Sequence, residues 1–171
     1  AYQLFVDRAR AINPRFLNNE ESEEVVEICQ KLSGLPLAIE VAAAQTRTLN
    51  LATILSGLKN SNTWQRRAGY SISVHQKTLD QAIRWSYDLL SESEKTLFCR
   101  LSVFSGGWTM EAAQEICCDD FICTPSQFNE IHASLLDKSL VAANAENTRF
   151  YFYESLRFFS TEMFDTHEEN G

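Results

Sequence analysis

The chain has 171 residues, of which 44% are hydrophobic and 22% are charged, the ordinary composition of a water-soluble globular protein. Its formal net charge of −8 disfavours binding to nucleic-acid phosphates and to anionic membrane surfaces. No apolar run approaches the roughly 20 residues that a membrane span needs. The five cysteines, an odd number, mostly occupy apolar helical positions, which is typical of reduced thiols. We therefore expect a cytoplasmic protein.

The first sixty residues predict one helical subdomain of four short helices. Asn19 is the expected N-cap of the second helix, and Gly34 stands where a helix C-cap belongs. Pro36 suits the first turn of the third helix, where its missing N–H costs nothing. The four predicted helices cover residues 2–12, 20–32, 36–47 and 51–58.

Residues 61–78 differ in composition from what precedes them. They are polar, partly basic and without a clear period, so we interpret them as a solvated linker between two subdomains.

The remainder, residues 79–171, predicts a winged-helix-like subdomain with one small β-hairpin. Two capping boxes open helices here, Ser91 with Glu94 and Thr124 with Gln127. The predicted helices cover residues 79–90, 92–104, 110–117, 125–138 and 155–164, and the hairpin lies within residues 140–153. The expected fold is therefore mostly α.

Motifs for catalysis are missing from the sequence. The chain has no GxxxxGK[ST] phosphate-binding loop, no nucleophile elbow and no HExxH metal helix. His132 lies beside an apolar helix face, which favours a packed imidazole over a catalytic one. Cys117, Cys118 and Cys123 have no matching second pair of ligands, so we expect no metal site. An enzyme with an unrecognised site is the reading we rank last.

A winged helix often binds DNA, but the charges disfavour this role here. The candidate recognition helix, residues 125–138, sets Glu130 and Asp137 against Lys138 alone. The hairpin offers only Arg149, opposite Glu146. We therefore expect no DNA binding by this chain.

Five segments together resemble one protein family: LFVDRARA (4–11), ICxxLSGLPLAIEVAAA (28–44), IRWSYDLLSESEKTLFCRLSVFSGGWTMEAAQEIC (83–117), LLDKSLV (135–141) and RFYFYESLRFFS (149–160). Their order is similar to that in STAND signalling ATPases, specifically the NB-ARC-like ATPase region of bacterial LuxR-type and antibiotic-pathway regulators. In that family a P-loop nucleotide-binding domain comes first. A helical subdomain with a GLPL motif follows it, and then a winged helix.

The resemblance implies nucleotide-facing residues. The GLPL turn, Gly34, Leu35, Pro36 and Leu37, would close over the adenine side of ATP or ADP, with the ring of Pro36 on the base. Eukaryotic relatives carry Met-His-Asp at the end of the wing, where this chain has Phe152, Tyr153 and Glu154. Glu154 is acidic like the aspartate of that motif, but Tyr153 stands in place of its histidine. Packing of Phe152 and Tyr153 therefore stays an alternative to phosphate contact.

The resemblance implies a non-catalytic regulatory fragment that gates a signalling or transcriptional switch. ATP or ADP would be held by a P-loop domain of the full-length protein, and no nucleotide is expected on this chain alone. That P-loop domain would be the intramolecular partner, and self-assembly of the full-length protein is a further expectation. The alternative is a free-standing DNA-binding winged-helix regulator.

Overall fold

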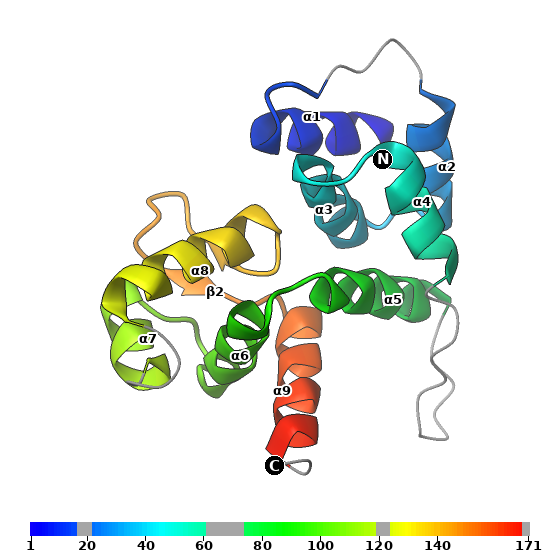
Figure 1. The fold of residues 1–171 in the computed structure, drawn as a ribbon. Helices are drawn as coiled ribbons and strands as arrows, with labels where there is room; N and C mark the ends of the chain where they lie inside the picture. The colour runs from blue at the N-terminus through cyan, green and yellow to red at the C-terminus, as the bar shows by residue number, and fades with distance from the viewer. Residues whose placement is uncertain (17–21, 61–73, 119–123, 169–171) are drawn as a thin grey trace. The chain divides into compact units, whose positions relative to one another are not determined.

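A computed structural model describes residues 1–16, 22–60, 74–118 and 124–168. The described chain is mostly helical, with one small two-stranded antiparallel sheet, as the sequence predicted (Figure 1). It divides into two compact units, Ala1–Asp88 and Leu89–Gly171, which are described separately below.

Unit 1 is helical throughout its described residues. Helix α1 packs against α3, α2 against α4, and α3 against α5. The second helix begins later than predicted, at Glu23, because the Oγ of Ser22 accepts the N–H of Val25 and so caps it. The predicted cap, Asn19, lies outside the described residues. The elements are α1 (Tyr2–Ile12), α2 (Glu23–Lys31), α3 (Pro36–Ala44), the 3₁₀ turn η1 (Gln45–Arg47), α4 (Leu51–Asn60) and α5 (Val74–Asp88).

The centre of unit 1 is helix α3. Both α1 and α5 pack on it. Small alanine side chains let neighbouring helices approach closely, and the buried apolar area stabilises the unit. The buried residues of α3 are Ala38, Ile39, Val41, Ala42, Ala43 and Ala44.

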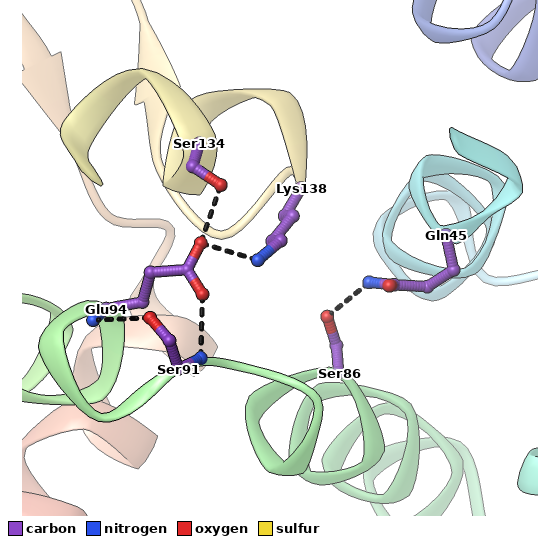
Figure 2. Close-up of polar contacts among 6 residues, drawn as sticks. All are labelled: Gln45, Ser86, Ser91, Glu94, Ser134 and Lys138. Carbon is purple, nitrogen blue, oxygen red and sulfur yellow. Dashed lines mark hydrogen bonds and ion pairs between the residues drawn. The ribbon is translucent and has the colours of Figure 1, made fainter. Parts of the chain in front are cut away.

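Helix α5 belongs to unit 1, whereas the sequence analysis grouped residues from 79 onward with the second subdomain. Ala82 joins the apolar core of unit 1. The buried Gln45 donates from its Nε2 to the Oγ of the buried Ser86 across 2.8 Å (Figure 2). The division therefore falls after Asp88, because α5 buries its inner face on α3. Of the predicted linker 61–78, residues 61–73 lie outside the described residues.

Unit 2 has the order helix, helix, helix, hairpin, helix. In the hairpin, Ala142 pairs with Tyr151 and Ala143 with Phe150. Trp108 extends this edge, since its N–H and carbonyl both bond to the backbone of Phe150 at 2.8 Å. The elements are α6 (Glu92–Arg100), the 3₁₀ turn η3 (Leu101–Val103), α7 (Met110–Cys117), α8 (Pro125–Asp137), β1 (Ala142–Ala143), β2 (Phe150–Tyr151) and α9 (Glu154–Glu168).

Both predicted capping boxes are confirmed. The Oγ of Ser91 accepts the N–H of Glu94 at 3.3 Å, and the Glu94 carboxylate accepts the N–H of Ser91 at 2.8 Å. The N–H of Thr124 donates to Oε1 of Gln127 at 2.9 Å. These local bonds fix where α6 and α8 begin.

Candidate functional site

The GLPL turn between α2 and α3 is a Schellman motif. The N–H of Gly34 donates to the carbonyl of Cys29 at 3.1 Å, and the N–H of Ser33 donates to that of Gln30 at 2.9 Å. Ser33 and Gly34 both adopt left-handed backbone conformations, with φ of 53° and 68°. The cap itself is Leu32, so Gly34, the predicted C-cap, stands two residues beyond the observed one. Two successive left-handed residues reverse the chain, and α3 can then start at Pro36.

The turn lies at the surface of unit 1. Leu35 and Leu37 are half-buried, and Leu35 packs against the apolar core. Gly34 and Pro36 are exposed, and a Cβ built on Gly34 would have no neighbouring atom within 4 Å. Leu35 therefore anchors the turn, while the ring of Pro36 faces outward.

A turn of this kind can offer an apolar contact to a flat ring, but it cannot hold a phosphate. Pro36 has no N–H to donate, and its ring is a rigid apolar surface. Within the described segments, no glycine is followed by lysine, so no P-loop is present there. The turn therefore presents an exposed apolar ring, and the described segments around it contain no phosphate-binding loop.

The second set of predicted site residues lies in unit 2. The ring of Phe152 packs against Phe98 and Trp108, with centroid distances of 5.0 and 5.1 Å. Tyr153 is 45% exposed and makes an edge contact with Tyr151 at 5.7 Å. Glu154, the first residue of α9, is exposed. Packing is thus the clear role of Phe152, while Tyr153 and Glu154 remain accessible to a ligand.

His132 is a packed residue, as the sequence predicted. It is 2% exposed, and its Nε2 accepts a hydrogen bond from Nε1 of Trp108 at 3.0 Å. The ring of Phe150 lies at 4.6 Å. Burial lowers the pKa of His132 to about 4, so the imidazole is neutral at physiological pH. A neutral imidazole inside aromatic packing is structural and has no access to substrate.

A buried carboxylate joins α6 to α8, and sequence reasoning missed this second role of Glu94. Its Oε1 accepts from Oγ of Ser134 at 2.6 Å and from Nζ of Lys138 at 2.5 Å, two of the contacts drawn in Figure 2. Its Oε2 accepts from the backbone of Ser91. Burial alone raises the pKa of Glu94, but the hydrogen bonds from Lys138, Ser134 and Ser91 outweigh it and hold the pKa below its ordinary value. The capping box gave no signal of these distant partners.

The cysteines correct one expectation. Cys29, Cys99 and Cys117 are free and buried, in line with the predicted reduced thiols, and burial raises the pKa of Cys117 to about 11. Cys118 is disulfide-bonded, which contradicts that prediction at this position. It follows the end of α7 and is half-buried, unlike the three buried thiols. Cys123 lies outside the described residues.

The described part of the chain holds neither a candidate metal site nor a candidate membrane span. Its His, Cys, Asp and Glu side chains form no group of three or more that could hold a metal ion. None of its helices is both long and apolar enough to cross a bilayer.

Among the described residues of α8, its C-cap and the hairpin, the side chains with a positive charge are Lys138 and Arg149. Lys138 is bound by Glu94, and Nη2 of Arg149 donates to the carbonyl of Gly106 at 3.2 Å. Glu130 on α8 and Glu146 beside the hairpin are exposed. This face of unit 2 therefore presents carboxylates to solvent and few available cations.

The chain matches no protein-family model. An uncharacterized protein of Mycobacterium tuberculosis is 39% identical over 150 residues, which are 87% of this chain and 38% of that protein. A protein named "Putative HTH-type transcriptional regulator" from the same species is 35% identical over 165 residues, 95% of this chain and 19% of its own length. Mycobacterium bovis has counterparts of both at the same identities. The chain thus spans well under half the length of the curated relatives it matches.

Proposed function

We propose that this chain is a regulatory part of a larger transcriptional regulator. The supporting observation is its 35% identity, over 95% of its length, to the mycobacterial protein named as such a regulator. The matched region is only 19% of that protein, so DNA contact in the relative need not fall in the matched region.

The relative's name favours the DNA-binding alternative over the nucleotide-switch reading of the sequence. The charges of unit 2 count against DNA contact by this segment, since Glu94 pairs with Lys138 and the exposed Glu146 lies in the same hairpin as Arg149. Specific DNA binding needs several cations placed on phosphates. The DNA-binding surface of such a regulator is therefore expected elsewhere than on this chain.

Fluorescence anisotropy with a labelled random duplex tests this assignment. At about 150 mM salt we expect no saturable binding by the chain, and Lys138→Ala and Arg149→Ala should change nothing. Tight binding that weakens steeply between about 50 and 150 mM salt, and that either substitution reduces, would establish the DNA-binding alternative.

A second candidate is the nucleotide-switch role that the family resemblance implies, in which unit 1 closes over ATP or ADP. One observation favours it: Pro36 presents an exposed ring on a turn that its own unit leaves uncovered. The P-loop domain of a longer protein would bind the phosphates, and Tyr153 and Glu154 would reach the nucleotide from the wing. Nucleotide-dependent closure is a common way to bias a two-state regulator.

Substituting Pro36 in a longer protein that carries this chain tests the second candidate. If the ring packs on adenine, Pro36→Ala removes some tens of Å² of apolar contact and weakens ADP binding by about 1 kcal/mol, several-fold in affinity. Pro14→Ala is the matched control, because Pro14 is also an exposed proline in unit 1. Unchanged ADP release with a lowered thermal midpoint would reduce the turn to a structural role.

A further inference from the structure

A surface hollow of about 710 Å³ runs along helix α9 in unit 2. Six of its lining residues are Phe152, two positions before α9 begins, and five residues of α9 itself. They are Phe152, Glu154, Arg157, Phe158, Glu162 and Asp165. The α9 residues recur every three or four positions, so they occupy one face of the helix over three turns, roughly 16 Å.

The opposite face of α9 holds the helix firmly on unit 2. Leu156 and Phe159 are at most 2% exposed. The Oγ of the fully buried Ser160 donates to the carbonyl of Phe98 at 2.7 Å. Helix α9 also packs against α6 and η3. The hollow is therefore carried by a fixed helix, which is a suitable platform for binding.

The hollow combines an exposed aromatic ring with a negative surround. Phe158 is 61% exposed, a large apolar area to leave in water. Three carboxylates line the hollow, Glu154, Glu162 and Asp165, against the single guanidinium of Arg157. Anionic ligands such as nucleic acid, acidic peptides and anionic lipid are repelled by this charge.

We propose that this hollow is a docking surface for a basic amphipathic helix of a partner protein or domain. Apolar side chains of that helix would cover Phe158, and flanking lysine or arginine residues would face Glu162 and Asp165. A hollow about three turns long matches the helix-in-groove mode, in which apolar anchors give affinity. Opposite charges at the edges give orientation and specificity.

Two synthetic helical peptides of one pattern test the proposal, one of leucine and lysine and one of leucine and glutamate. Each is labelled, and its binding to the 171-residue chain is followed by fluorescence anisotropy. We expect saturable binding of the lysine peptide alone, weakened about tenfold by Phe158→Ser. The double substitution Glu162→Lys, Asp165→Lys should abolish this binding and permit binding of the glutamate peptide.

Helix α7 supplies the matched controls. Ile116 is 59% exposed, a fraction similar to that of Phe158, and the neighbouring residue Glu115 is also exposed. Ile116→Ser and Glu115→Lys should leave the affinity unchanged, and circular dichroism confirms that each variant is folded. If the α7 substitutions weakened peptide binding as much as the α9 substitutions do, binding would reflect diffuse charge attraction and the proposal would be overturned. So would absence of lysine-peptide binding, or equal binding of both peptides.

Discussion

The two units differ in what they bury. Among its described residues, unit 1 buries apolar side chains and the neutral polar residues Gln45, Thr46 and Ser86. Among its described residues, unit 2 buries an aromatic cluster and two groups that titrate in acid, the carboxylate of Glu94 and the imidazole of His132. Acid should therefore act on unit 2 first, because the pKa values of the buried His132 and Glu94 are both lowered, so the unfolded chain takes up these protons more readily than the folded unit.

Truncating the core of unit 1 should give the largest effect. Ile39 is fully buried in α3, so Ile39→Ala leaves a cavity and lowers the free energy of unfolding by about 3 kcal/mol. The loss should be equal near pH 7 and near pH 5, as measured by urea titration. Val74→Ala is the control, since Val74 is 72% exposed on α5. If Ile39→Ala lowered the free energy of unfolding more near pH 5 than near pH 7, the proposed difference between the two units would be wrong.

Removing the charge of Glu94 should cost unit 2 about 2 kcal/mol. Glu94→Gln leaves Lys138, a partly buried cation, without its ionised partner. On the same helix, Glu92 pairs with Lys95, but its side chain is 84% exposed, so Glu92→Gln should change stability little. Thermal unfolding of the two variants gives the difference. Similar thermal midpoints for Glu94→Gln and Glu92→Gln would mean that the buried Glu94–Lys138 contact stabilises unit 2 no more than the exposed Glu92–Lys95 pair.

A smaller effect is expected at the contact between α4 and α5. A Cβ on Gly57 would lie 2.3 Å from Nε1 of Trp85, so Gly57→Ala forces the indole to move. Alanine raises helix propensity by about 1 kcal/mol, which offsets part of that cost and leaves a net loss of about 1 kcal/mol. A Cβ on Gly106 would have no neighbouring atom within 4 Å, so Gly106→Ala should cause no loss of stability from steric crowding. Chemical denaturation measures both. A stabilised Gly57→Ala would show that α5 packs loosely.

Local signals in the sequence predicted most of the helices. The capping boxes at Ser91 and Thr124 each use residues three positions apart, so one short segment contains the whole signal. The place of α5 depends on Gln45 and Ser86, which are 41 residues apart. No local pattern reports such a pairing, and α5 was therefore grouped with the wrong neighbours.

The candidate site was predictable only in part, for the same reason. Gly34 and Pro36 marked the turn, because one tolerates left-handed backbone and the other starts a helix. The left-handed conformation of Ser33 was not predictable, since serine seldom adopts it. The engagement of Lys138 by Glu94 depends on the packing of α8 on α6, which the charge pattern alone does not contain.

The most direct test of the difference between the units is amide NMR of the chain during acid titration. The pKa of His132 is lowered from 6.5 to about 4, so the unfolded chain takes up this proton more readily than the folded unit. Unit 2 should lose about 3 kcal/mol as the pH falls from 6.5 to 4. The contribution of Glu94 follows at lower pH, because its folded pKa lies below the ordinary 4.5. We predict that unit 2 resonances broaden or vanish while those of unit 1 persist. Simultaneous loss of both sets, or earlier loss of unit 1, would contradict the account.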